Sequence, residues 1–412
     1  MSFVLKIGSF FLLFITQIVL ARTMSLEGFG FYSYLISISA ILHLIASFGQ
    51  PNLNTRNFSR IPDNSSVYVS LAKTSIKRNI ILSSIIIFIA ITLIYVFKWN
   101  WKEIMAVVII LSITPISSIN ASLNGILLGR KNIVQSNIGD KLVRPILISL
   151  SAWLLYEING NLSIFEASLI TLLSTIVVLL INYAFYSINL KSVKRNEEVL
   201  SKNELNNSWK IGLSLMITSG MYVLFKQIDI IMIGTIIETD SAGIYKVASR
   251  LSNLAVFSLM AVNIVVAPHF SKLYSENKMK ELQKLLTYSS RIIFTITCFI
   301  SIGLIIFSDK ILSLFGETYT SAQDILYILL IGQIVNSATG SVGFLMNMTN
   351  LHKQATIILS ISTVLNLILN YVLIKLYNIE GAAIATTITT IIINISMAIY
   401  CYTKMKLRSS LL

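Results

Sequence analysis

Long apolar stretches alternate with short polar ones along almost the whole chain. A helix that crosses a bilayer needs about 20 mostly apolar residues, and it satisfies its own backbone hydrogen bonds in lipid. Twelve stretches meet this need: 3–21, 29–49, 79–97, 104–128, 143–157, 164–187, 211–235, 242–267, 289–308, 323–348, 355–376 and 380–402. The alternating polar and apolar residues of a membrane β-barrel strand do not occur in them. The pattern predicts an all-α polytopic membrane protein with 12 transmembrane helices.

Composition supports this prediction and narrows the chemistry. Of the 412 residues, 55% are hydrophobic and 12% charged, whereas a soluble domain carries about 25% charged residues. The net charge of +14 favours anionic membrane lipids and phosphate-bearing substrates as partners in such a protein, and we expect no nucleic acid. The sequence contains no P-loop, nucleophile elbow, HExxH or paired CxxC motif. We therefore expect neither an enzyme nor a bound metal or cofactor.

The loops between the predicted spans divide the basic residues unequally. One side of the membrane carries 24 lysines and arginines in its loops and ends, and the other carries 5. Lys and Arg are enriched in cytoplasmic loops. The N- and C-termini are therefore predicted to lie in the cytoplasm, which requires an even number of spans.

Two stretches resemble each other in the first and second parts of the chain. Glu27, Gly30 and Tyr32 recur as Asp240, Gly243 and Tyr245 at an offset of 213 residues. A shorter match follows further along, where Phe58-Ser59-Arg60 recurs as Phe270-Ser271-Lys272. The shared order indicates a duplication.

Each half then holds six helices, with the N-terminal half at 1–190, a charged cytoplasmic linker at 191–210 and the C-terminal half at 211–412. An even number of spans per half starts both halves on the same side. The pseudo-two-fold axis that relates them is therefore expected along the membrane normal.

The run Ala21–Tyr32 resembles the "AR-x-L-G-x-E-x-F-G-x-Y" signature of polysaccharide-exporting flippases, although Met24-Ser25 stands where that family usually has Leu-Gly. Asp229–Tyr245 and Pro268–Ser271 are similar to the counterpart in the second half. The superfamily also contains multidrug and toxin extrusion exporters and lipid II flippases. The most similar subgroup is the O-antigen or capsule repeat-unit flippase (Wzx type).

The resemblance implies a bacterial cytoplasmic (inner) membrane protein of polysaccharide or lipopolysaccharide biosynthesis. Its substrate would be an oligosaccharide on undecaprenyl diphosphate, moved by alternating access through a central cavity lined by spans 1, 2, 7 and 8. The resemblance also allows contacts with a polysaccharide polymerase and a chain-length regulator.

Four ionisable residues fall inside predicted spans: Lys226 and Asp229 in span 7, and Lys246 and Arg250 in span 8. Each pair shares a helix face, and intramembrane charges are functional by default. Asp229 and Lys246 lie roughly 7–9 Å from the outer ends of their helices, and Lys226 and Arg250 roughly 14 Å. We expect Asp229 to neutralise Lys246, which leaves Lys226 and Arg250 to bind a diphosphate. A buried ion network that joins the two helices is the alternative.

Other charged residues have two possible roles each. Arg22, at the outer end of span 1, is a candidate to hold the glycan or phosphate, or an interfacial anchor. Four cytoplasmic arginines, which either guide the lipid diphosphate into the inward-open cavity or set topology and contact anionic lipids, are Arg56, Arg60, Arg130 and Arg144. His43 in span 2 and Asp229 are candidates for proton coupling, and a packing role is the alternative for His43.

Other functions fit the sequence less well. A multidrug exporter of organic cations would need an acidic cavity, whereas spans 7 and 8 are rich in Lys and Arg. A membrane glycan polymerase or ligase generally has a large external loop, and the outer loops here are short. A lipid II flippase typically has extra spans.

Overall fold

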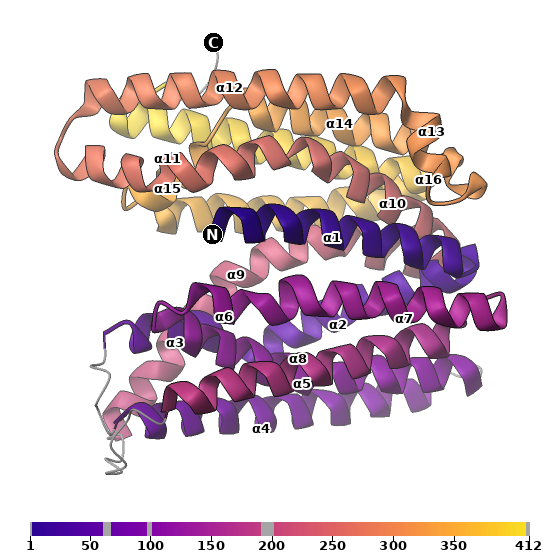
Figure 1. The fold of residues 1–412 in the computed structure, drawn as a ribbon. Helices are drawn as coiled ribbons and strands as arrows, with labels where there is room; N and C mark the ends of the chain where they lie inside the picture. Colours follow the sequence, from indigo (N-terminus) through magenta and orange to yellow (C-terminus); the bar gives the residue numbers. More distant parts are fainter. Residues whose placement is uncertain (1, 61–66, 97–100, 191–201, 409–412) are drawn as a thin grey trace. The chain divides into compact units, whose positions relative to one another are not determined.

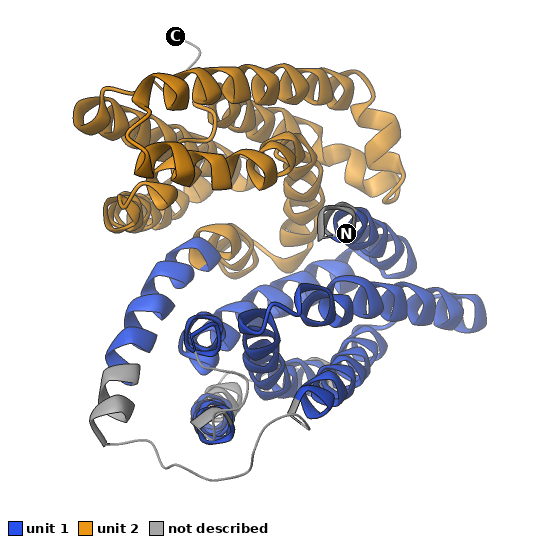
Figure 2. Ribbon diagram, turned by 60° about the vertical axis from the view of Figure 1, so that its left-hand side comes forward, with its two compact units in different colours: residues 1–223 blue, residues 224–412 orange. Residues whose placement is uncertain are grey.

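A computed structural model describes residues 2–60, 67–96, 101–190 and 202–408 of the chain (Figure 1). Within these ranges the chain is helical and contains no strand. It divides into two compact units, Met1–Val223 and Leu224–Leu412 (Figure 2), so the division falls inside one long helix, α9. The expected linker at 191–210 begins with residues 191–201, which lie outside the described residues, and its remainder is the start of α9.

The helices of each unit follow one another with short connections. Unit 1 contains α1 (Ser2–Thr23), α2 (Leu26–Ser47), α3 (Gln50–Phe58), α4 (Val67–Val96), α5 (Trp101–Gly129), α6 (Ile133–Ile138), the π-helical η1 (Gly139–Val143), α7 (Arg144–Asn159), α8 (Ile164–Leu190) and the first part of α9 (Lys202–Ile236). Unit 2 contains the rest of α9, then α10 (Thr239–Ala255), α11 (Phe257–Ser275), α12 (Met279–Ile306), α13 (Ser308–Ser313), the 3-10 helix η2 (Glu317–Ala322), α14 (Gln323–Ala338), α15 (Val342–Met348) and α16 (His352–Met405).

Every predicted span falls on a helix or on two consecutive helices. Six described helices are by themselves long and apolar enough to cross a membrane. Two pairs of consecutive helices, bent by 43° and 46° at the break, could each form one further span, which gives up to eight. α16 has 54 residues, so at about 1.5 Å per residue it far exceeds a hydrocarbon core of about 30 Å. Its helical backbone breaks at Tyr377 and Asn378, between two predicted spans. The protein is an all-α polytopic membrane protein, and the total of twelve spans stays a prediction.

Local sequence explains where α2 begins and ends. Ser25 caps the helix, because its Oγ accepts a hydrogen bond from the Gly28 amide at 3.1 Å. Phe48 and Gly49 are left-handed, with φ of 45° and 68°, and turn the chain into α3. A Cβ at Gly49 would lie 2.4 Å from the carbonyl oxygen of Gly212 in α9. The span expected at 29–49 therefore ends at a turn that only glycine fits against α9.

Polar side chains join helices inside unit 1. Asn54 of α3 donates from Nδ2 to Ser75 Oγ (2.9 Å) and to the Ser122 carbonyl oxygen (3.1 Å). Asn79 of α4 donates from Nδ2 to the Ser118 carbonyl oxygen (2.6 Å) and to Ser122 Oγ (2.7 Å). Amide and hydroxyl groups of this kind hold helices together where lipid supplies no hydrophobic driving force.

Close backbone contact between α3 and α5 provides a test of this packing. A Cβ at Gly125 would lie 2.3 Å from the carbonyl oxygen of Pro51. Gly125→Ala should lower the free energy of unfolding by about 1–3 kcal/mol, because α3 must move away. Gly303→Ala is the matched control, since nothing lies within 4 Å of its Cβ, and helix propensity should make it neutral or stabilising by up to about 1 kcal/mol. Thermal unfolding in detergent measures both, and equal shifts would contradict the contact.

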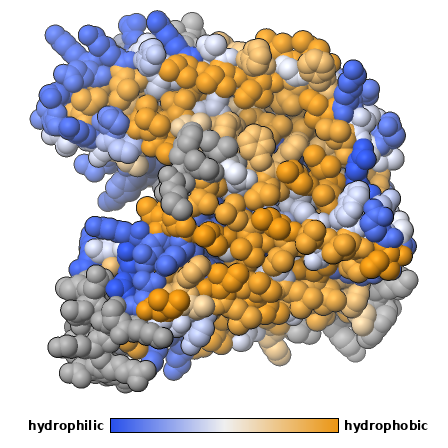
Figure 3. Space-filling view, in the orientation of Figure 1, coloured by the Kyte–Doolittle hydropathy of each residue, from blue (hydrophilic) through white to orange (hydrophobic). Residues whose placement is uncertain are grey.

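Large apolar side chains cover the lengths of the helices. Phe88, Leu180 and Phe299 are 73%, 62% and 79% exposed. Figure 3 shows hydrophobic residues along the middles of the helices and hydrophilic ones gathered at helix ends. This distribution is what a lipid-facing surface requires.

Candidate functional site

A buried carboxylate lies where α9, α10 and α16 meet in unit 2. Asp229 is only 4% exposed. Its Oδ2 accepts hydrogen bonds from Tyr245 Oη (2.5 Å) and Thr386 Oγ1 (2.7 Å), and its Oδ1 accepts one from Asn370 Nδ2 (2.9 Å). All three donors are neutral, and together they replace hydration that the carboxylate loses on burial. Asp229 is therefore fixed in one orientation by three separate segments.

The two halves of α16 both contribute to this site. Asn370 precedes the break in the helix and Thr386 follows it, yet both donate to Asp229. Asn366 donates across the same junction to Thr386 Oγ1 (3.2 Å) and Thr389 Oγ1 (3.4 Å). The break at Tyr377 thus folds α16 back on itself, and polar groups line the contact between its halves.

Three basic side chains lie on the same two helices as the carboxylate and its tyrosine. Lys226 of α9 is exposed, and Lys246 and Arg250 of α10 are half-buried, one turn apart. Lys246 lies within electrostatic range of both Lys226 and Arg250. The membrane-spanning part of this unit therefore carries a group of positive charges beside a single carboxylate that neutral donors surround.

The expected ion pair between Asp229 and Lys246 is wrong. In the described part of the chain, Asp229 bonds to neutral donors and forms no ion pair with Lys246. Successive residues on a helix point about 100° apart. Because Tyr245 faces Asp229, its neighbour Lys246 must point elsewhere. Position along the two helices did not predict the direction of their side chains. An ion network closed through Asp229 fails for the same reason.

The other predicted arginines lie in unit 1 and differ in exposure. Arg22 is exposed at the end of α1, and Arg56 and Arg60 are exposed at and just after the end of α3. Arg130 is half-buried, and its Nη1 donates to the carbonyl oxygen of Asn189 at 2.7 Å. This bond satisfies a last-turn carbonyl of α8, so Arg130 has a structural partner inside unit 1.

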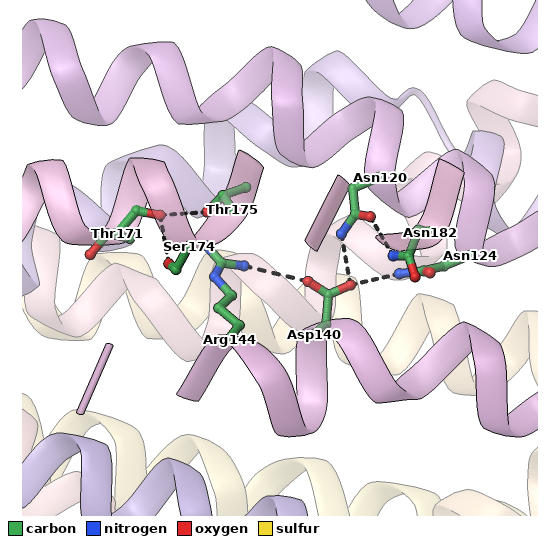
Figure 4. A network of polar contacts seen from close by, with 8 residues as sticks. All are labelled: Asn120, Asn124, Asp140, Arg144, Thr171, Ser174, Thr175 and Asn182. Atoms are coloured by element: carbon green, nitrogen blue, oxygen red, sulfur yellow. Dashed lines mark hydrogen bonds and ion pairs between the residues drawn. The ribbon is translucent and has the colours of Figure 1, made fainter. Parts of the chain in front are cut away.

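A second carboxylate, which the sequence analysis did not single out, holds the remaining arginine (Figure 4). Asp140 Oδ2 accepts hydrogen bonds from Asn120 Nδ2 (2.9 Å) and Asn124 Nδ2 (2.6 Å). Its Oδ1 lies 3.6 Å from Arg144 Nη1. Asn182 of α8 donates in turn to Asn120 Oδ1 at 2.5 Å. The network joins α5, η1, α7 and α8, and it keeps Arg144 beside Asp140.

Asp140 occupies an irregular piece of helix. Gly139–Val143 is π-helical, a conformation that occurs mostly as single turns and frequently at functional sites. A Cβ at Gly139 would lie 2.8 Å from Val178 Cγ1 and 3.2 Å from Asn182 Oδ1. The glycine therefore allows the π turn to approach α8 closely enough for the network to form.

His43 lies in α2 of unit 1, whereas Asp229 belongs to unit 2. The His43 side chain is half-buried, and its buried Nδ1 has no hydrogen-bond partner among the described residues. Proton coupling by either residue stays a prediction. Over the same residues, no three His, Cys, Asp or Glu side chains gather in a way that could hold a metal ion.

Two protein families match parts of the chain. A family described as "Polysaccharide biosynthesis protein" matches residues 1–274, which is well over half of the sequence. The chain belongs to the polysaccharide biosynthesis protein family. The MatE family matches residues 214–372. Both matches confirm the resemblance to polysaccharide flippases and to the superfamily of multidrug and toxin extrusion exporters.

Two similar proteins are named as probable flippases, one of them a flippase of glycan biosynthesis. "Probable low-salt glycan biosynthesis flippase Agl15" of Haloferax volcanii is 30% identical over 171 residues, which are 40% of this chain and 35% of that protein. "Probable flippase AglR" of the same organism is 28% identical over 168 residues, again 40% and 35%. The chain thus matches about a third of the length of these relatives.

Solved transporters share the fold of this family member. An inward-facing multidrug resistance MATE family transporter of the MOP superfamily aligns with a TM-score of 0.74 at 15% identity, over 96% of this chain and 94% of that one. A MOP superfamily transporter from Pyrococcus furiosus aligns with a TM-score of 0.66 at 14% identity, over 98% and 94%. The architecture is therefore that of the superfamily.

Both carboxylates bind amides that sequence reasoning passed over. Asn120 and Asn124 are four residues apart within one predicted span, and Asn366 and Asn370 are four residues apart within another. Asparagine is costly in lipid unless it finds a hydrogen-bond partner, and this spacing puts both amides on one helix face. Such paired asparagines in this family's spans could have pointed to a buried acceptor, but not to which one.

Proposed function

We propose that the protein is a flippase that moves an oligosaccharide linked to undecaprenyl diphosphate across the bacterial cytoplasmic membrane, for O-antigen or capsule synthesis. One observation supports this most directly. Lys246 lies within electrostatic range of both Lys226 and Arg250, so three basic side chains come together on two adjacent membrane-spanning helices. A group of basic side chains at this depth suits a phosphate-bearing headgroup.

The transport step needs no bond to be made or broken. The lipid tail stays in the bilayer while the charged, hydrated headgroup crosses hydrocarbon, a transfer that costs several kcal/mol for each unsatisfied polar group. Arg250 can bind a phosphate oxygen pair in a bidentate manner, and the two lysines add point charges. Alternating access of the two halves would then release the headgroup on the other side.

Net transport in one direction requires an energy source. As the working hypothesis, we assign proton coupling to Asp229 or His43. Both are titratable groups inside membrane-spanning helices, where ionisable residues commonly serve proton relays. The basic loops favour cytoplasmic N- and C-termini. On the outer side, a polysaccharide polymerase, with its chain-length regulator, would remove the product.

The test is complementation of a strain that lacks its own repeat-unit flippase, scored by surface polysaccharide. Lys226→Gln with Arg250→Gln should lower surface polysaccharide at least tenfold, because two charge-assisted contacts to the diphosphate are lost. The control is Lys310→Gln with Lys353→Gln, which removes the same charge from two exposed positions of unit 2 and should retain activity. Expression in the membrane is verified for every variant.

Two outcomes would count against the proposal. Full activity of the Lys226 and Arg250 double variant would exclude these side chains as the diphosphate site. Failure of the unmodified protein to complement, together with resistance to organic cations in the same cells, would favour a multidrug exporter instead.

A further inference from the structure

One face of α12 combines positive charge with apolar surface along its length. Lys284, Tyr288 and Arg291 are exposed and spaced i, i+4 and i+7, so they form a stripe on one side of the helix. The same side continues with Phe299 and Ile302, which are 79% and 56% exposed. In Figure 3 the start of α12 is hydrophilic and the rest of its exposed face is hydrophobic. The stripe therefore has a polar end and an apolar end.

A groove lies at the polar end of this stripe. It is shallow and open, and it is lined by six residues of α12: Gln283, Lys284, Leu285, Thr287, Tyr288 and Arg291. Gln283 also anchors the C-terminal segment, because its Nε2 donates to the Arg408 carbonyl oxygen (2.8 Å) and its Oε1 accepts from the Arg408 amide (2.7 Å). The groove thus contains two cations, a phenol, a hydroxyl and an amide, and no acidic side chain.

One nearby acid, Glu276, is paired with Lys278. Lys278 Nζ lies 2.8 Å from Glu276 Oε2, and Glu276 and Glu281 together raise the pKa of Lys278. Within the described part of the chain, neither Lys284 nor Arg291 forms an ion pair. The positive charge of the groove is therefore available to a ligand from outside.

The location of the groove indicates what kind of ligand would fit. The distribution of basic loops predicts that α12 begins on the cytoplasmic side, at the level of lipid headgroups. From Arg291 to Ile306, which is 68% exposed, the helix rises about 22 Å, more than one leaflet of the hydrocarbon core. An acyl chain can lie along this surface, whereas a hydrophilic oligosaccharide cannot be hydrated there.

We propose that this groove binds the headgroup of an anionic phospholipid, with Lys284 and Arg291 on its phosphate and its acyl chains along Phe299 and Ile302. Tyr288, between the two cations, is placed to donate to the same phosphate. The site differs from the proposed diphosphate site on α9 and α10, and it is independent of the transported substrate.

Binding of phosphatidylglycerol to purified, delipidated protein tests the proposal, measured by native mass spectrometry and by the rise in unfolding temperature. Lys284→Gln with Arg291→Gln should weaken binding roughly thirty-fold, as expected for the loss of two basic residues at a membrane surface. The control, Lys353→Gln with Lys404→Gln, removes the same charge from exposed positions of unit 2 that are predicted to be cytoplasmic, and it should bind like the unmodified protein.

Measurements with other ligands identify which chemical group binds. Phosphatidylcholine and inorganic phosphate should produce no rise in unfolding temperature, because the first carries no net charge and the second has no acyl chain. Equal binding of phosphatidylglycerol by the unmodified protein and the groove variant would overturn the proposal. A control variant that loses as much binding as the groove variant would also overturn it. Displacement of phosphatidylglycerol by undecaprenyl diphosphate at equal concentration would overturn it in favour of a substrate site.

Discussion

Replacement of Asp229 by alanine should both destabilise unit 2 and abolish transport. The substitution leaves the hydroxyls of Tyr245 and Thr386 and the amide of Asn370 without their shared acceptor. An orphaned buried donor costs about 1–3 kcal/mol, although hydrogen bonds measured in membrane proteins average about 0.6 kcal/mol. We therefore expect Asp229→Ala to lower the free energy of unfolding by about 2–4 kcal/mol.

Asp229→Asn separates the charge of this residue from its structural role. The amide oxygen can take the place of Oδ2 and keep the bonds from Tyr245 and Thr386. The amide nitrogen then faces Asn370 Nδ2, which also donates to the Asn366 carbonyl oxygen (3.0 Å) and Asn366 Oδ1 (3.1 Å) and is held in this orientation. Asp229→Asn should thus lose one hydrogen bond and lower the free energy of unfolding by about 1–2 kcal/mol, less than Asp229→Ala, while transport falls at least tenfold if the carboxylate carries the proton.

Three measurements distinguish these roles: unfolding in detergent, surface polysaccharide in complementation, and the dependence of transport on external pH. Tyr377→Phe removes an exposed hydroxyl at the break of α16 and should leave all three unchanged. Asp229→Asn with normal transport at every pH would exclude proton coupling at this site and leave His43 as the remaining candidate. If the Asp229→Asn variant proves as unstable as the Asp229→Ala variant, the hydrogen bonds themselves need the charge.

The membrane-spanning helices could be predicted from the sequence because lipid leaves the backbone little choice. A segment without water must satisfy its peptide groups internally, so apolar length alone specifies a helix. The segments at 355–376 and 380–402 were separated correctly even though α16 runs through both. Bends within the helices were predicted less well, because tertiary contacts decide where they occur. The span expected at 242–267 is two helices bent by 43° between Ala255 and Phe257.

The candidate site could be predicted only in part, and for a physical reason. The cost of burying charge singled out Asp229 and its basic neighbours from their positions inside predicted spans. Their hydrogen-bond partners depend on where the side chains of other helices, distant in the sequence, point. Asn370 and Thr386 lie 141 and 157 residues beyond Asp229, and a single sequence does not show which of its helices bring such residues together. Arg144 was expected at a cytoplasmic opening, whereas the structure places it 3.6 Å from Asp140 Oδ1, four residues earlier in the chain.

Replacement of Asp140 by alanine should have the next largest effect, and mainly on stability. The change removes the acceptor of Asn120 and Asn124 and the ion-pair partner of Arg144. Removing one member of a buried pair costs about 3–5 kcal/mol. The side chains here are 27% and 31% exposed at a distance of 3.6 Å, so solvent screening reduces the expected loss to about 2 kcal/mol.

The double variant Asp140→Ala with Arg144→Ala separates ion pairing from substrate binding. Without the carboxylate, Arg144 is an uncompensated charge, so its removal should recover part of the lost stability, with a coupling energy of about 0.5–3 kcal/mol between the two sites. If Arg144 also guides the lipid diphosphate, the double variant will be more stable than Asp140→Ala but less active in complementation. Arg144→Lys at unchanged stability is then expected to transport poorly, because an ammonium cannot bind phosphate in a bidentate manner. Normal transport by the double variant would instead limit Asp140 and Arg144 to holding α5, α7 and α8 together.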